Sequence, residues 1–367
     1  MSCMEVEDLE RKILGITMGD PAGVGPEITV RALANTDVCQ RCRPLVIGDG
    51  DVLERAARLT GHGDIEIHRI KSVKEAYFLP GVIDVYDLGL EQMDAVEPGK
   101  VSAIAGEAAF RCVEKAVRLA MDGEIDGTVT NPICKEAINL AGHHYSGHTE
   151  IYAAYTGTKH YAMMLACGNL KVAHVSTHVS LREACDLVKE QRVLDVTAMV
   201  WRACRAMGIS DPVIGVAGLN PHSGENGMFG REEMEEIGPA IARAREMGIR
   251  AEGPVPPDTV FSKAIGGWYD AVVAMYHDQG HIPVKVKGFV YKEEEGKWDS
   301  VSGVNITLGL PIIRTSVDHG TAFDLAGTGK ANEKSLMEAI EYGIMLAEHF
   351  EGGEALGSRK ESQTVEG

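Results

Sequence analysis

The sequence predicts an α/β protein of two domains with a ligand-binding cleft between them. Short apolar runs alternate with longer stretches of helical spacing, which is the order of elements in βαβ units. A chain of 367 residues exceeds what one hydrophobic core usually serves. Three histidines, His178, His222 and His277, each follow an apolar run. Because ligands of open α/β sheets gather beyond the carboxyl ends of the strands, these imidazoles would converge in the cleft.

The first half of the chain shows the alternation most clearly. The strand-like runs LGITM and PLVIGD each precede a predicted helix. A longer helix, with apolar residues on one face, ends near Gly123 before the strand GTVTNP. The three helices are expected at residues 26–34, 52–60 and 105–120.

The second half of the chain again alternates strands and helices. The sequence predicts a hairpin, then one helix or two, and then two buried strands with a further helix between them. The charged run KEEEGK, residues 292–297, is typical of an exposed loop or hairpin tip. The tail after Gly352 is expected to be mobile. The hairpin is expected at 161–165 and 170–175, the following helical region at 181–208, the strands at 213–218 and 271–275, and the helix between them at 232–247.

Composition excludes several classes of partner. A formal net charge of -18 makes nucleic acid a poor partner, since affinity there rests on lysine and arginine. No apolar stretch reaches the length of a membrane span, and MSCMEVEDLERK has no basic start or apolar middle, so a cytoplasmic protein is expected. An anionic substrate would need a few local cations to overcome the acidic surface.

The eight cysteines show no disulfide framework, which fits a reducing compartment. Cys39 and Cys42 form a lone C-x-x-C without a second pair, so buried thiols are expected there rather than a redox or zinc site. A single histidine after a strand is more often an ordinary loop residue than a metal ligand. The three histidines above also lack zinc-finger or H-E-x-x-H spacing, and their metal role depends on their neighbours.

Two segments near the cleft are rich in polar groups. GDPAGVGPE, residues 19–27, opens a helix but matches neither a dinucleotide fingerprint nor a P-loop, so a structural turn and a ligand contact both stay open, with Asp20 as a wall of the cleft. In residues 130–150, His148 and Thr149 offer donors for an oxyanion such as phosphate. Thr149 could equally cap a helix, and both roles are compatible.

Cations follow in the last third of the chain. Lys285 lies shortly after His277, and the stretch 304–332 supplies Asn305, Arg314 and a second glycine-rich loop. Lysine and arginine beside candidate metal ligands favour a small phosphorylated or carboxylated substrate.

At these residues the chain resembles the 4-hydroxythreonine-4-phosphate dehydrogenase (PdxA) family. The resemblance rests on MGDPAGVGPE, SGHTE, GLNPHSGENG, GPVPPDT, HDQG and NITLGLPIIRTSVDHGTA, in this order and over nearly the whole folded chain. GENGMFGREE resembles the branch that acts on D-threonate or D-erythronate 4-phosphate. The segment 287–303 is longer than the short loop of the biosynthetic members, which leaves an amino acid and a sugar acid both open as substrate.

The resemblance implies an isocitrate/isopropylmalate dehydrogenase-like fold of two domains, with residues 1–135 and 300–367 in one and residues 136–299 in the other. It also implies a homodimer whose metal site is shared between subunits. The implied metal ligands are His178, His222 and His277, and the implied substrate contacts are His148, Thr149, Lys285, Asn305 and Arg314.

The loop HGTAFDLAGTGKAN resembles the NAD-binding loop of isocitrate and isopropylmalate dehydrogenases. The implied cofactor contacts are His319, Gly320, Thr321, Ala322 and Asp324. Three imidazoles suit zinc best among divalent ions, with magnesium, cobalt and manganese as alternatives. The choice between NAD and NADP stays open.

The implied reaction is oxidation of a secondary alcohol in a four-carbon, 4-phosphorylated acid, followed by decarboxylation. Lys285 and Asp258 are the candidates for proton transfer. Two other classes remain alternatives: a metal-dependent hydrolase or acyl-transfer enzyme of related fold, and a metabolite-binding protein without catalysis.

Overall fold

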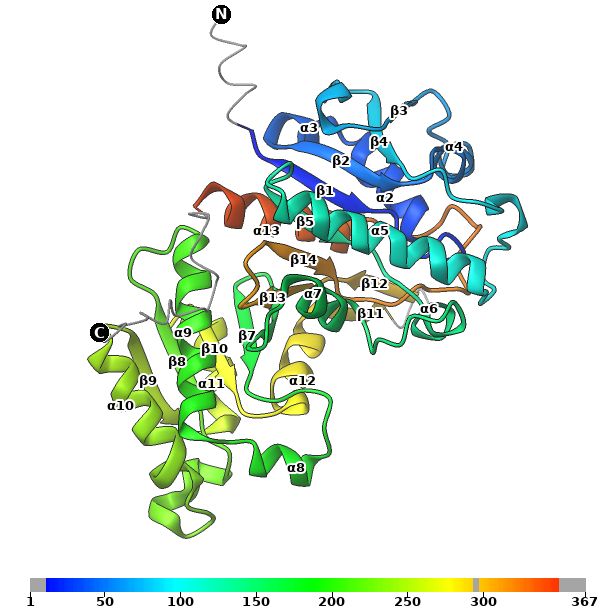
Figure 1. Ribbon diagram of the computed structural model, residues 1–367. Helices are drawn as coiled ribbons and strands as arrows, with labels where there is room; N and C mark the ends of the chain where they lie inside the picture. Colours follow the sequence, from blue (N-terminus) through cyan, green and yellow to red (C-terminus); the bar gives the residue numbers. More distant parts are fainter. Residues whose placement is uncertain (1–10, 293–296, 350–367) are drawn as a thin grey trace, which may run out of the picture.

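The computed structural model describes residues 11–292 and 297–349 as an α/β protein built around one large sheet. Twelve strands of the described chain form this sheet in the order β3-β4-β2-β1-β5-β14-β13-β6-β7-β10-β8-β9. Figure 1 shows the strands in two lobes, one blue to cyan and the other green to yellow, with β13 and β14 between them. The predicted α/β class is therefore confirmed.

The N-terminal block is a parallel array that ends at β14. Its central strand β1 is buried along nearly its whole length, as expected of a strand covered on both faces. The helix α5 packs on β1, β2 and β5. The elements are β1 (Ile13–Thr17), α2 (Gly25–Ala34), α3 (Thr36–Arg41), β2 (Arg43–Gly48), α4 (Gly50–Leu59), β3 (Glu66–Ile70), β4 (Val82–Asp87), α5 (Ala103–Met121), β5 (Gly127–Thr130), α6 (Lys135–Leu140) and α7 (His148–Thr156).

A second parallel block is formed by β7, β10, β8 and β9. The helix α9 is the longest in this block and packs on β8 and β10. The elements are β6 (Ala162–Cys167), β7 (Leu170–His174), α8 (Leu181–Asp186), α9 (Glu190–Ala206), β8 (Val213–Ala217), η3 (Pro221–Gly227), η4 (Glu233–Ile237), α10 (Gly238–Glu246), β9 (Arg250–Val255), α11 (Pro257–Ile265), β10 (Ala271–Ala274) and α12 (His277–Gly288).

Three antiparallel pairings, β14 with β13, β13 with β6 and β6 with β7, join the two blocks. The two blocks therefore run in opposite directions. Alternation along a strand places Asn305 and Thr307 of β13 on one face, and likewise Arg314 and Ser316 of β14. The remaining elements are β11 (Phe289–Lys292), β12 (Lys297–Val301), β13 (Val304–Leu308), β14 (Arg314–Val317) and α13 (Lys334–Glu348).

Most predicted elements are present within a few residues of their expected bounds, and the predicted hairpin is the antiparallel pair of β6 and β7. Residues 181–208 form two helices, α8 and α9, and the predicted helix 232–247 begins as one π-helical turn, η4, before α10. The structure adds β3, β4 and β9, which have exposed or mixed faces. The strands β11 and β12 form a hairpin whose tip, residues 293–296, lies outside the described residues, as does the tail after Gly352.

The predicted division into two domains, residues 1–135 with 300–367 and residues 136–299, stays a prediction. Strands of both predicted domains belong to one hydrogen-bonded sheet, so the strand pairing does not mark a boundary between them. Among the helices of the described chain, none combines the length and the apolar content that crossing a bilayer requires.

Candidate active site

Six of the residues predicted from the sequence line one cavity of about 400 Å³. The cavity lies where β13 and β14 meet β6 and β7, and its wall also includes residues of the helices α6, α7, α9 and α12 and of the loop after β7. The six residues are His148, Thr149, His178, Lys285, Asn305 and Arg314.

Arg314 is the principal cation of this cavity. It opens β14, is only 3% exposed, and donates hydrogen bonds to the hydroxyl oxygens of Thr130 (3.0 Å) and Thr307 (2.9 Å). Its guanidinium lies 5.7 Å from the ring centre of Tyr152, and burial lowers its pKa to about 10. Within residues 11–292 and 297–349 no carboxylate pairs with it. A buried guanidinium without a carboxylate is arranged to receive an anion from outside.

The start of α7 adds neutral donors beside Arg314. His148 is the first residue of α7, and its Nε2 is buried with no hydrogen-bond partner in the described chain. Burial, and then Arg314, lower the pKa of His148 well below its usual value, so the ring stays neutral. Gly147 occupies the N-cap, so the alternative of Thr149 as the cap is wrong. The free N–H groups of this first turn lie at the positive end of the helix dipole, where they can donate hydrogen bonds to an anion.

Two more predicted contacts complete the polar wall. Asn305 presents a buried Oδ1 that has no hydrogen-bond partner among the described residues. The ammonium of Lys285 forms an ion pair with Asp318 and also donates to the main-chain oxygen of Asp318 (3.1 Å). Asp318 was not predicted as a site residue, although it directly precedes the predicted cofactor loop. Arg192 also lines the cavity, but it donates to the main-chain oxygens of Val175 and Tyr161.

Three imidazoles, His174, His178 and His281, line the side of the cavity facing these groups, and His277 lies beside them in an adjoining cavity that His178 also lines. The ring centres of His178 and His277 lie 5.8 Å apart, and His281 stacks on His277 at 3.6 Å. His174 lies behind His281, 4.6 Å between ring centres. Burial and then the neighbouring imidazole lower the pKa of His281 to about 4, while burial and His281 lower that of His174 to about 3. Neutral imidazoles are the form that binds divalent metals.

His222 does not join this group within one chain. It follows β8, a neighbour of β10 in the sheet, but lies in a left-handed turn at φ 51° and is 69% exposed, near Glu225 and Phe229. It lines another cavity, of about 690 Å³, together with Asp258. The described chain holds no group of three metal-binding side chains, so a single subunit does not bring the three predicted ligands together. Asp258 is likewise outside the cavity that contains Lys285.

The predicted cofactor loop packs against the glycine-rich turn before α2. The main-chain oxygen of Thr321 accepts from Val24 (3.0 Å), and a side chain at Gly23 would stand 3.0 Å from that oxygen. Ala322 has φ 45°, in the left-handed region. The carboxylate of Glu27 accepts from the main-chain N–H groups of Gly327 (2.6 Å) and Gly329 (2.8 Å). The motif GDPAGVGPE therefore supports the loop that carries His319, Gly320, Thr321, Ala322 and Asp324.

Cys39 and Cys42 are buried free thiols, and burial raises the pKa of Cys42 to about 12. A thiol of this kind is a poor nucleophile and metal ligand, in line with the expected structural role.

Asp20 is fully buried, and burial raises its pKa to about 6. One oxygen accepts from Ala22 (2.9 Å), and the other has no partner in the described chain. The folded pKa of Asp20 lies above the value in the unfolded chain. The contribution of Asp20 to the free energy of unfolding is therefore greatest at low pH, and it falls as pH rises through 6. We expect the stability of Asp20→Asn, relative to the native protein, to increase by about 2 kcal/mol between pH 4 and pH 8. Urea unfolding at both pH values measures this, and an unchanged difference would contradict it.

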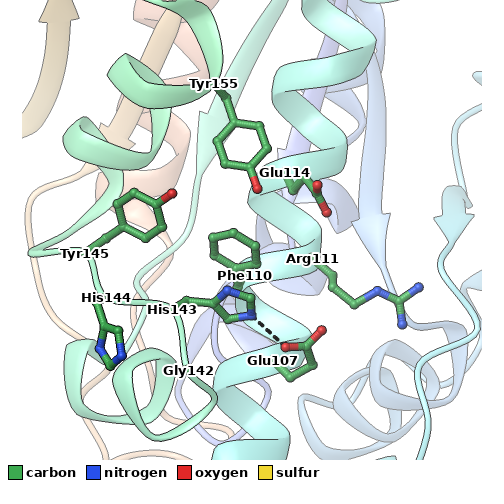
Figure 2. A pocket seen from close by; sticks show the side chains of 9 residues that line it. All are labelled: Glu107, Phe110, Arg111, Glu114, Gly142, His143, His144, Tyr145 and Tyr155. Atoms are coloured by element: carbon green, nitrogen blue, oxygen red, sulfur yellow. Dashed lines mark hydrogen bonds and ion pairs between the residues drawn. The ribbon is translucent and has the colours of Figure 1, made fainter.

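A neighbouring cavity of about 570 Å³, between α5 and the loop before α7, contains none of the predicted residues. Figure 2 shows Tyr145 and Tyr155 around Phe110, with His143 joined to Glu107. His143 stacks on Phe110 with ring centres 3.6 Å apart. The cavity is lined by one cation, Arg111, and by two carboxylates, Glu107 and Glu114, so it offers a phosphate no excess of positive charge. The cavity lined by Arg314 is therefore the candidate anion site.

The sheet and its buried, cation-lined cavity beside neutral imidazoles define an α/β protein with a site for a small anion. The chain belongs to the PdxA family: residues 40–343 match the family described as pyridoxal phosphate biosynthetic protein PdxA. It is 48% identical over 339 residues to D-threonate 4-phosphate dehydrogenase of Salmonella typhimurium, covering 92% of this chain and 100% of that protein.

Two further relatives agree with this family. The D-threonate 4-phosphate dehydrogenase of Cupriavidus necator is 49% identical, over 91% of this chain and 97% of that protein. Among solved structures, a 4-hydroxythreonine-4-phosphate dehydrogenase from Klebsiella pneumoniae is similar with a TM-score of 0.81 and 45% identity, over 92% of this chain and 98% of that chain. The resemblance identified from the sequence motifs is confirmed.

Proposed function

We propose that this protein is an NAD-dependent dehydrogenase that oxidises a four-carbon, 4-phosphorylated hydroxy acid and releases its carboxylate as carbon dioxide. The observation that carries the proposal is the buried guanidinium of Arg314, which has no carboxylate partner in the described chain and faces a cavity beside neutral imidazoles. The dehydrogenases among its relatives support the reaction class.

The phosphate would lie at the Arg314 end of the cavity. Arg314 supplies charge, and His148, Thr149 and the N–H groups at the start of α7 supply donors. Asn305 adds an amide whose oxygen is still unpartnered among the described residues. These contacts fix C4 and direct the carbon chain toward the imidazole wall.

The metal site would be shared by two copies of the chain in a homodimer. His178 and His277 lie side by side, and burial lowers the pKa of His178, which fits two positions of a zinc site; His222 of a second copy would supply the third. Magnesium, cobalt and manganese remain alternatives for this set. When bound, such an ion acidifies a coordinated hydroxyl and polarises the resulting carbonyl.

The oxidation removes a hydride from C3 and a proton from the C3 hydroxyl, which gives a ketone β to the carboxylate. The C1–C2 bond then breaks, carbon dioxide leaves, and a proton is added at C2. The ammonium of Lys285, held by Asp318, is the proton donor for C2 in this proposal. Asp258 of a second copy remains the alternative for proton transfer.

NAD would bind along the loop with His319, Gly320, Thr321, Ala322 and Asp324. The loop follows Asp318, which lines the substrate cavity, and ends at Gly327, which lines a separate cavity of about 260 Å³. A dinucleotide bound along it would accept the hydride at the substrate end.

The substrate proposed is D-threonate 4-phosphate or its D-erythronate isomer rather than 4-phosphohydroxythreonine. The two relatives of known name at 48% and 49% identity are D-threonate 4-phosphate dehydrogenases. The motif GENGMFGREE, residues 224–233, supports the same branch.

NADH formation by the zinc-loaded protein tests this proposal with the three phosphorylated acids side by side. We expect at least about tenfold higher kcat/KM for a sugar acid than for the amino acid, the size of one lost or mismatched polar contact. Preference for the amino acid would overturn the substrate assignment. No NADH from any of them would overturn the dehydrogenase, and absence of nicotinamide binding would then favour a hydrolase or acyl-transfer enzyme. Binding of both ligands without turnover would favour a metabolite-binding protein.

A further inference from the structure

His174 and His281 form a hydrogen-bonded pair that the proposed substrate and metal contacts do not use. His174 is 1% exposed at the end of β7, and His281 lies in the first half of α12 on the cavity wall. His281 Nδ1 lies 3.1 Å from His174 Nε2. A Cβ atom at Gly280 would stand 2.4 Å from this same Nε2, so the absence of a side chain at Gly280 makes room for the pair.

The acceptors around the pair determine which ring nitrogens carry protons. His174 Nδ1 lies 3.3 Å from the main-chain oxygen of Met163, which can only accept. The proton is therefore on Nδ1, and Nε2 of His174 is an acceptor. His281 Nδ1 faces that acceptor and also the main-chain oxygen of His277 (3.0 Å). His281 therefore carries its proton on Nδ1, which leaves Nε2 as a lone-pair acceptor.

The Nε2 atom of His281 has no hydrogen-bond partner in residues 11–292 and 297–349, and its ring lines the substrate cavity. The ring is held on two sides, because it stacks on His277 and its Nδ1 bonds to His174 and to the main-chain oxygen of His277. A rigid, neutral acceptor at this place is matched to a hydroxyl donor.

We propose that His281, oriented by His174, accepts a hydrogen bond from the C2 hydroxyl of the substrate and so favours a substrate with a hydrogen-bond donor at C2 over one that lacks it. The inference rests on the proposed function, in which the phosphate at Arg314 fixes C4 and the reacting C3 would lie between Lys285 and His178. C2 is then the next carbon along the imidazole wall. His281 is thus a specificity residue, and His174 a positioning residue that acts through it.

The test compares D-threonate 4-phosphate with its 2-deoxy analogue, 3-hydroxy-4-phosphooxybutanoate. Calorimetric binding to the zinc-loaded protein without NAD is measured for the native chain and His281→Leu. The native chain is expected to bind the hydroxy acid at least about tenfold more tightly than the analogue, the value of one hydrogen bond in a desolvated site. His281→Leu is expected to bind both ligands within about threefold of each other, because the acceptor is gone.

The controls separate this role from a structural one. His174→Leu is expected to give intermediate discrimination, since His281 keeps its bond to the oxygen of His277. His62→Leu, in the loop before β3 at the far edge of the sheet, should retain the native ratio. Equal loss of affinity for both ligands in His281→Leu, or no discrimination by the native chain, would overturn the proposal. Because binding is read without NAD, a failure of the dehydrogenase proposal would appear separately, as absence of NADH.

Discussion

Replacing Arg314 by methionine is expected to lower kcat/KM by about 1,000-fold or more and to leave the protein at least as stable as before. The guanidinium is buried and has hydroxyl partners but no carboxylate in the described chain. Burial without a counter-charge costs free energy in the unliganded protein, and methionine fills a similar volume without that cost. In the complex the same charge would pair with the phosphate in a desolvated site, where losing one partner costs several kcal/mol.

Thermal unfolding with and without inorganic phosphate checks this expectation together with steady-state kinetics. The Tm of the native chain should rise with phosphate, while Arg314→Met should have an equal or higher Tm that no longer responds. Arg192→Met is the matched control, because Arg192 lines the same cavity but donates to main-chain oxygens. It should be destabilised and still respond to phosphate. A phosphate response that persists in Arg314→Met would place the anion elsewhere.

The class of fold could be predicted because buried strands have short apolar runs as their sequences. β1, β2, β8 and β10 are almost completely buried and were all predicted from such runs. The edge strand β3 was missed because three residues of its sequence EIHRI are polar and only one of the five is buried, so it has no apolar run. The order of the strands in the sheet could not be predicted. The antiparallel pairing of β13 with β6 joins segments about 140 residues apart, and local sequence patterns do not indicate such distant partners.

The substrate end of the site could be predicted residue by residue, but part of its supporting structure could not. His148, Arg314 and Asn305 sit in recognisable motifs and line one cavity. His174 and His281 were missed. His174 ends an apolar strand, β7, and has the sequence context of an ordinary core residue. A signal was present in HDQGH, where the spacing of four residues places His277 and His281 on one face of a helix.

The position of His222 could not be derived from the sequence of one chain. The strand order β7-β10-β8 does bring the ends of the three predicted strands together. The loop after β8 then passes through left-handed residues from His222 to Asn226 and leaves the imidazole exposed. Exposed apolar side chains lie nearby, among them Met228 at 73% and Phe229 at 50%. An exposed candidate ligand beside exposed apolar groups is expected of an interface between two copies.

Mixed dimers of His178→Ala and His222→Ala subunits are expected to recover activity that neither variant has alone. Each pure variant should lose about 1,000-fold or more in kcat, because a three-ligand site with one imidazole missing binds its metal poorly. In a mixed dimer, one site would combine His178 and His277 of one subunit with His222 of the other. That intact site would give about half of native activity per dimer, since the second site carries both defects.

Differently tagged subunits, co-expressed and purified through both tags, allow zinc content and NADH formation to be measured on the mixed dimer alone. The matched control pairs His178→Ala with His277→Ala. Both of these imidazoles lie on the same wall of one chain, 5.8 Å between ring centres, so neither site of that dimer would be intact. Recovery of zinc and activity in the first pair but not in the second requires that His222 act across the interface. Absence of recovery in both pairs would mean that a loop movement brings His222 to the site within its own subunit.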